Sequence, residues 1–89
     1  MASKKEIEQM KKIVSEEALE CYLEHDAEYE FHCFDNEVQT LYVWQCRDSK
    51  NSVEFEMLKP LERRVAKINS RYRIGILFED VSWGMEPDE

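Results

Sequence analysis

The chain is poor in glycine, the residue that builds phosphate-binding loops, since its 89 residues include only two. A nucleotide site needs a glycine-rich loop whose backbone amides face a phosphate. Gly75 falls inside an expected strand and Gly84 falls among acidic residues near residue 89, so neither belongs to such a loop. Gly75 instead indicates a bulge or a close approach of a helix to a sheet.

Long apolar runs are also missing, because no stretch approaches the roughly 20 apolar residues that span a bilayer. Residues 1–12 alternate Lys and Glu and lack the apolar segment of a signal peptide. The cysteines, Cys21, Cys33 and Cys46, are odd in number and have no closely spaced pair. We therefore expect a cytoplasmic protein with free thiols and no membrane partner.

Positive charge is absent from residues 13–46, which contain nine Asp or Glu and neither Lys nor Arg. Residues 47–73 show the opposite bias, with eight Lys or Arg and four Asp or Glu. The formal net charge of the whole chain is −8. Unless folding brings these blocks together, the molecule presents a negative region and a smaller positive one.

The first helix is expected from Lys4 to His25, because Ser3 and Glu6 form a capping-box pattern and no Gly or Pro follows before His25. Leu19 and Leu23 lie outside its apolar stripe and indicate either a bend near Ser15 or a second contact surface. The stripe that is expected to face the core contains Ile7, Met10, Val14, Ala18, Cys21, Tyr22 and His25.

Alternating apolar and polar residues predict strands at 29–34, 38–46, 53–57 and 72–78, and a helix at 60–69 that begins with Pro60. The predicted fold class is therefore α+β, with the element order α-β-β-β-α-β. We expect a mostly antiparallel four-stranded sheet with both helices packed on one face. The predicted domain covers residues 1–81, and residues 82–89 are expected to form an acidic C-terminal tail.

Catalytic and metal sites are not expected. Cys21 and His25 share a helical face, but His32 and Cys33 are adjacent in a strand and should point to opposite faces, which argues against zinc. Glu54 and Glu56 on one strand face are more typical of solvated surface than of a Mg²⁺ site. The cysteines lie in apolar patterns that raise the pKa of a thiol. We therefore predict a protein that is not an enzyme and binds no cofactor.

A basic cluster on and after the second helix makes a nucleic-acid-binding module the alternative hypothesis. The nine acidic residues would repel the same polyanion, so nucleic acid is not the expected partner. A second alternative is that the basic helix neutralises the acidic one, within one molecule or across a dimer. The residues assigned to the alternative nucleic-acid site are Lys59, Arg63, Arg64, Lys67, Arg71 and Arg73.

The acidic block favours a small non-catalytic protein that binds a basic surface of another macromolecule, such as a nucleic-acid enzyme. A phage-type inhibitor of a host defence enzyme, an immunity protein and a secretion chaperone all match this size and charge. A homodimer through Leu19 and Leu23 is a further hypothesis, and Trp83 is a candidate anchor for a partner. The predicted partner-binding residues are Glu16, Glu20, Glu24, Asp26, Glu28, Glu30, Asp35, Glu37 and Trp83.

Overall fold

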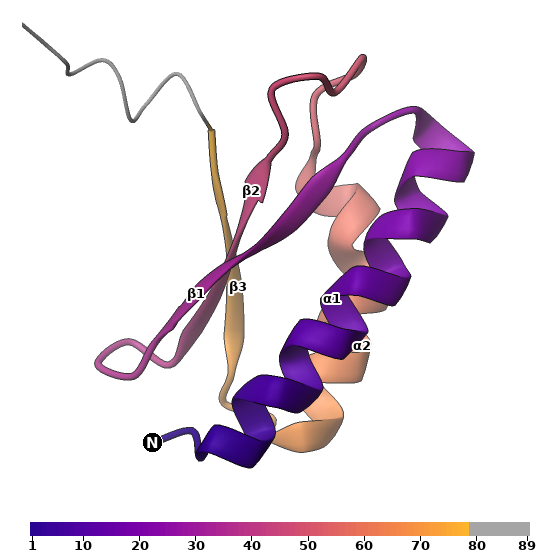
Figure 1. The fold of residues 1–89 in the computed structure, drawn as a ribbon. Helices are drawn as coiled ribbons and strands as arrows, with labels where there is room; N and C mark the ends of the chain where they lie inside the picture. Colours follow the sequence, from indigo (N-terminus) through magenta and orange to yellow (C-terminus); the bar gives the residue numbers. More distant parts are fainter. Residues whose placement is uncertain (79–89) are drawn as a thin grey trace, which may run out of the picture.

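A long helix, α1 (Lys4–His25), begins the fold and lies beside a three-stranded sheet (Figure 1). The computed structural model describes residues 1–78. The bounds of α1 are those that the sequence predicts, and its capping box is formed, because the Ser3 hydroxyl accepts from the Glu6 amide at 3.1 Å and the Glu6 carboxylate accepts from the Ser3 amide at 3.3 Å. Leu19 and Leu23 are 58% and 69% exposed. They therefore contribute nothing to the core.

The sheet contains β1 (Tyr29–Asp35), β2 (Thr40–Gln45) and β3 (Arg73–Leu77), in the spatial order β1-β2-β3. The predicted hairpin of β1 and β2 is confirmed, since these strands pair antiparallel. β2 and β3 pair parallel. The prediction of a mostly antiparallel four-stranded sheet is therefore wrong, and the described residues form a three-stranded mixed sheet within an α+β fold.

The strand predicted at residues 53–57 is replaced by a short 3-10 helix, η1 (Phe55–Leu58). Gln45 at the end of β2 accepts a hydrogen bond from the Val53 amide through its side-chain oxygen at 2.6 Å, so the chain turns away from the sheet there. Met57 then donates to the carbonyl of Glu54 at 2.8 Å. Val53 is buried while Phe55 is 60% exposed, so the apolar alternation that suggested a strand does not describe one buried face.

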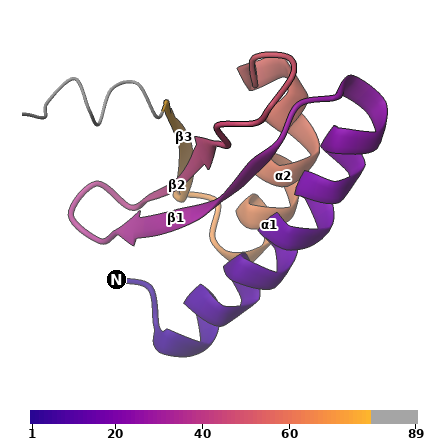
Figure 2. The ribbon, with the colours of Figure 1, turned by 45° about the horizontal axis from the view of Figure 1, so that its top comes forward.

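The second helix, α2 (Lys59–Ile68), explains the parallel pairing of β3. A chain that leaves β2 and crosses through a helix returns in the same direction as β2, whereas a tight turn would reverse it. Pro60 lies in the first turn of α2, where its missing amide costs no hydrogen bond. Both helices lie on the same side of the sheet, as predicted (Figures 1 and 2).

The core lies between the two helices and the sheet. Its buried members come from both helices, η1, β1, β2 and the joining segments, and the partly buried Ile74 and Ile76 of β3 pack against them, so the elements are held by apolar burial and not only by local propensity. The buried residues are Met10, Val14, Cys21, Ala27, Tyr29, Leu41, Val43, Val53, Leu58, Leu61, Val65 and Tyr72.

The other face of the sheet carries polar and aromatic side chains. A register shift between Phe31 and Cys33 marks a bulge in β1, and it places Cys33 opposite Tyr42. The His32 ring packs on the Trp44 ring, with 4.9 Å between centroids. Since Tyr42 and Trp44 alternate with the buried Val43, His32 and Cys33 lie on the same face, and the expectation of opposite faces is wrong.

Gly75 is opposite Tyr42 in the parallel pair. A Cβ atom at this position would lie 2.6 Å from Cε1 and 2.8 Å from Cδ1 of the Tyr42 ring. The predicted close approach of a helix is therefore wrong, because the nearest atoms at this position belong to Tyr42 and Thr40 of the neighbouring strand. The bulge in the sheet is in β1.

Two expectations concern parts of the chain beyond this description. The domain boundary at residue 81 and the acidic tail at 82–89 lie outside the described residues, and so does Trp83. Among the described helices, none has the length and apolar character needed to cross a membrane.

Candidate functional site

The end of α1 is tied to the loop that follows β2. Asp26 ends the helix in the left-handed conformation, with φ of 59°, and its amide donates to the Tyr22 carbonyl at 2.9 Å. Asn51 donates from its side chain to the His25 carbonyl at 2.7 Å and from its backbone to the Asp26 carbonyl at 3.1 Å. Ser49 accepts from the Glu28 amide at 2.8 Å. The connection from α1 to β1 is therefore held by hydrogen bonds from residues about 20 positions further along the chain.

Acidic side chains lie on this connection and on the ends of α1 and β1 that it joins. Within residues 1–78, the carboxylates of Glu20, Asp26 and Glu28 form no ion pair with Lys or Arg. Glu24 lies 3.4 Å from the His25 imidazole, and Glu30 accepts a hydrogen bond from the Trp44 indole at 3.2 Å. We call the set Glu20, Glu24, Asp26, Glu28 and Glu30 the acidic end.

Glu16 differs from the acidic end, because Arg64 of α2 compensates it. Arg64 lies 2.9 Å from Glu16 and 3.0 Å from Glu17 through its two terminal nitrogens. These contacts, the hydrogen bond to Glu17 foremost, raise the pKa of Arg64. Neutralisation of the acidic helix by the basic one is thus present within the molecule, but in the described residues it reaches only Glu16 and Glu17.

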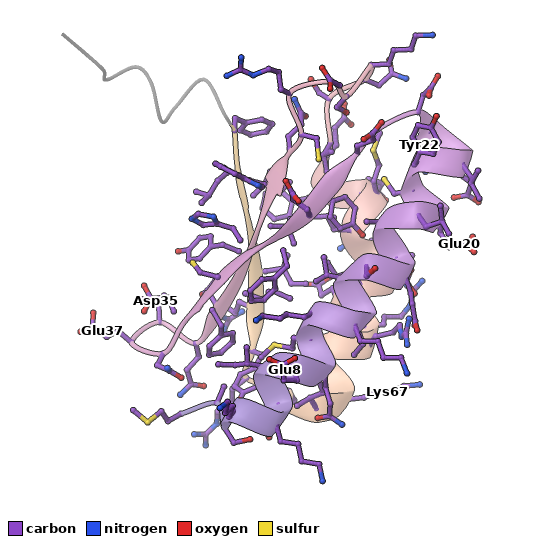
Figure 3. The ribbon with its side chains drawn as sticks, viewed as in Figure 1. Glu8, Glu20, Tyr22, Asp35, Glu37 and Lys67 are labelled. Atoms are coloured by element: carbon purple, nitrogen blue, oxygen red, sulfur yellow. The ribbon has the colours of Figure 1, made fainter. Side chains whose placement is uncertain are left out.

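Asp35 and Glu37 are also separate from the acidic end. They lie at the tip of the β1–β2 hairpin, at the opposite end of the molecule from Glu20 and Tyr22 (Figure 3). Asp35 accepts a hydrogen bond from the Glu37 amide at 2.9 Å. The eight predicted acidic binding residues that the structure describes therefore fall into three places: Glu16 against Arg64, the acidic end, and the hairpin tip.

Exposed apolar side chains accompany the acidic end. Tyr22 is 44% exposed and lies with Leu19 and Leu23 on the outer side of α1. A shallow hollow of about 250 Å³ is lined by Ala18, Leu19, Tyr22, Glu28 and Tyr29. The sequence pattern had assigned Tyr22 to the core stripe, so its role at the surface was missed. Its position at the margin of that stripe was the signal available.

The basic residues do not form one continuous track. Arg64 is occupied by two carboxylates, and Lys59 lies 3.8 Å from Glu62 in the same helix. Arg63 and Lys67 are exposed on α2, and Arg71 and Arg73 are exposed before and at the start of β3. Of the residues predicted for the alternative site, Lys59, Arg63 and Lys67 follow one another at four-residue intervals along one ridge of α2, while Arg64 faces α1 and Arg71 and Arg73 follow the helix.

Thiol and metal chemistry finds no organised centre in the described part of the chain. Burial raises the pKa of the Cys21 thiol, and the nearby Glu24 carboxylate raises it further. Burial likewise raises the pKa of the Cys33 thiol, with Asp35 adding to the effect. Such thiols are poor nucleophiles. Among residues 1–78, no group of three or more His, Cys, Asp or Glu side chains is arranged to hold a metal ion.

Comparisons of the chain with protein-family models, with curated proteins and with solved structures find no match. The charge and shape of its own surface are therefore the ground for a functional proposal.

Proposed function

We propose that this chain is a non-catalytic binding protein whose acidic end engages a basic surface of another macromolecule. The observation that carries the proposal is the set of carboxylates at Glu20, Asp26 and Glu28, which have no Lys or Arg partner among the described residues. Carboxylates that stay uncompensated in the fold attract a basic partner and speed its encounter. A nucleic-acid enzyme is one class of partner that presents a basic surface.

Apolar side chains beside the carboxylates support the same proposal. Charge alone gives an exposed contact little affinity, because water and salt screen it. Tyr22 and Leu23 supply apolar area beside Glu24, and aromatic side chains are common centres of binding energy in interfaces. A partner with basic side chains around an apolar centre therefore fits this surface best.

The experiment compares two charge reversals of equal size. Wild-type protein is immobilised beside Glu20→Lys/Glu24→Lys at the acidic end and Asp35→Lys/Glu37→Lys at the hairpin tip, and nuclease-treated lysate is passed over each. Proteins eluted by a salt gradient are identified, and the most abundant is purified and titrated. We expect a basic protein whose affinity falls at least about tenfold, or 1.4 kcal/mol, with the first variant and little with the second. Equal loss with both variants contradicts the proposal.

A second arm tests nucleic acid directly. Labelled single-stranded and duplex oligonucleotides are titrated with wild-type protein and with Arg63→Ala/Lys67→Ala at about 0.15 M salt. We expect no saturable binding by either protein. Binding that is lost in the double variant would replace the acidic-end proposal with the nucleic-acid-binding alternative.

A further inference from the structure

A groove runs along α1 on the side that faces β1 (Figures 1 and 2). It consists of two adjoining hollows of about 250 and 330 Å³, which share Ala18 and Tyr29 as lining residues. The α1 side of the groove repeats at helical spacing, through Lys11, Ser15, Ala18 and Tyr22. At a rise of about 1.5 Å per residue, these four positions extend over about 16 Å, or about three helical turns.

The floor of the groove is apolar, and apolar side chains are exposed beside it. Tyr29 is buried and Phe31 is half-buried on the β1 side, while Val14 is buried on the α1 side. Leu19 and Tyr22 line the first hollow and remain exposed. An occupant with apolar side chains would therefore remove its own apolar area and that of the groove from water together.

The edge of β1 decides the form of the occupant. β1 is an edge strand, but the register shift between Phe31 and Cys33 interrupts its ladder, and its exposed Glu30 carries charge. A bulge and charged side chains are features that prevent the addition of a strand. A helix needs no hydrogen bond from this edge, because its own backbone groups are paired internally. The small side chains of Ser15 and Ala18 also let a helix approach α1 closely.

Two members of the acidic end line the groove. Glu28 belongs to the first hollow and Glu30 to the second. Glu28 has no Lys or Arg partner within residues 1–78, and the Glu30 carboxylate, which accepts from the Trp44 indole, can accept further hydrogen bonds. Lys11 lines the second hollow as well, but it already lies 3.6 Å from Glu8. An occupant with Lys or Arg along the side that faces β1 therefore matches the groove in charge.

We propose that the groove binds an amphipathic helix of the partner, with its apolar face between α1 and β1 and its Lys or Arg side chains against Glu28 and Glu30. This inference rests on the proposed function, since it names the part of the basic partner that the acidic end recognises. Apolar residues three and four positions apart on such a helix reach both hollows. Glu20 and Glu24 lie roughly 140° to 180° around the α1 axis from Ser15, so they face a different part of the partner.

Two model peptides of about 15 residues test the inference with the full chain. Both contain the same numbers of Leu and Lys. The first peptide places Leu at helical spacing, whereas the second alternates Leu and Lys as in a strand. Binding of each labelled peptide is followed by fluorescence anisotropy at about 0.15 M salt. We expect the first peptide to bind at least about tenfold more tightly than the second.

Matched substitutions locate the bound peptide. Ser15→Arg places a long cation in the groove and should weaken binding at least about tenfold, whereas Gln9→Arg, exposed roughly 120° around the axis of α1, should change it less than about twofold. Glu28→Gln should weaken binding about threefold, and Glu37→Gln at the hairpin tip should leave it unchanged. If circular dichroism shows that Ser15→Arg is unfolded, Leu19→Lys takes its place.

Four results would overturn the inference. They are equal binding of the two peptides, no saturable binding of either, tighter binding of the alternating peptide, and equal affinity of Ser15→Arg and Gln9→Arg for the first peptide. Tighter binding of the alternating peptide would indicate a strand as the occupant. Wild-type protein that sediments at twice the chain mass of 10.7 kDa, and as a monomer after Ser15→Arg, would indicate a second copy and would also overturn the inference.

Failure of this inference is distinct from failure of the proposed function. If neither peptide binds, but a basic protein is retained by wild-type chain and lost from Glu20→Lys/Glu24→Lys, the groove is excluded and the acidic end remains the binding surface. If the first peptide binds in the groove and no basic protein is retained, the proposed function alone is contradicted.

Discussion

Arg64 donates a 3.0 Å hydrogen bond from Nη1 to Oε2 of Glu17, a residue 47 positions earlier in the chain. The Glu17 side chain is 17% exposed, whereas that of Arg64 is 39% exposed. The contact therefore joins α1 to α2 at the margin of the core, where solvent screens it only in part. Among the acids of α1, it also separates Glu16 and Glu17, which contact Arg64, from Glu20 and Glu24, which have no Lys or Arg partner among the described residues.

Removal of this link should destabilise the fold modestly. Arg64→Ala leaves the half-buried Glu17 carboxylate without its partner, and we expect a loss of about 1 kcal/mol in the free energy of unfolding, measured by urea titration. Arg63→Ala, at an exposed position on the same helix, is the control and should change it by less than about 0.5 kcal/mol. In a double-mutant cycle, Arg64→Ala combined with Glu17→Gln should lose less stability than Arg64→Ala alone. Equal effects of the two Arg variants would show that the contact contributes nothing.

Glu6 connects the start of α1 to the segment before β3. Its Oε1 accepts from the Ser3 amide at 3.3 Å and from the Tyr72 hydroxyl at 2.8 Å. Glu6→Ala removes the acceptor of both hydrogen bonds and should cost about 2 kcal/mol, whereas Ser3→Ala removes only the hydroxyl that caps the Glu6 amide and should cost about 1 kcal/mol. Thermal unfolding of Glu6→Ala and Ser3→Ala measures which variant loses more stability. Tyr72→Phe, which removes only the hydroxyl that donates to Glu6, is measured beside them. A larger loss for Ser3→Ala than for Glu6→Ala would contradict the expected order.

The effect of Gly75→Ala on stability should change sign when the Tyr42 ring is removed. Gly75→Ala places a methyl group where the Tyr42 ring lies, so the ring must move, and we expect a loss of about 1 kcal/mol. In a Tyr42→Ser background the same change only reduces the freedom of the unfolded chain, and it should stabilise the fold by about 0.5 kcal/mol. Urea unfolding of the four proteins in the cycle gives the coupling free energy. If Gly75→Ala changed the free energy of unfolding in the same direction in both backgrounds, the Tyr42 ring would not be the reason that position 75 favours glycine.

The stability of the fold should fall in alkaline solution through Tyr29. Burial raises the pKa of its phenol well above the ordinary value of 10.0, with Cys21 and Glu17 adding to the effect. A group whose pKa is raised in the folded state stabilises it fully below the unfolded pKa, and this contribution is lost as the pH rises toward the folded pKa. Between about pH 9 and pH 11, wild-type protein should therefore lose more stability than Tyr29→Phe.

Urea midpoints across that pH range measure the difference for Tyr29. Tyr22→Phe, at an exposed site on α1, is the matched control and should follow the wild-type curve. Parallel curves for wild-type protein and Tyr29→Phe would show that the Tyr29 phenol ionises as readily in the folded chain as in the unfolded one.

The sequence by itself determined the elements whose signals are local. The capping box of Ser3 and Glu6 and the absence of Gly and Pro predicted both ends of α1, and the turn residues at 35–36 predicted the hairpin. Both depend on contacts between residues close in the chain. The acidic character of the surface was likewise visible, because charge is a property of composition.

Tertiary structure alone decided what becomes of the residues from 53 to 57 and of the carboxylates. The Gln45 side chain accepts from the Val53 amide just before the 3-10 helix Phe55–Leu58, a contact that no pattern within 53–57 reveals. The packing of α2 on α1 likewise sets which acidic residues Arg64 reaches, and these are Glu16 and Glu17. Periodicity reports which face of an element is apolar, but distances between elements depend on how those faces pack in space.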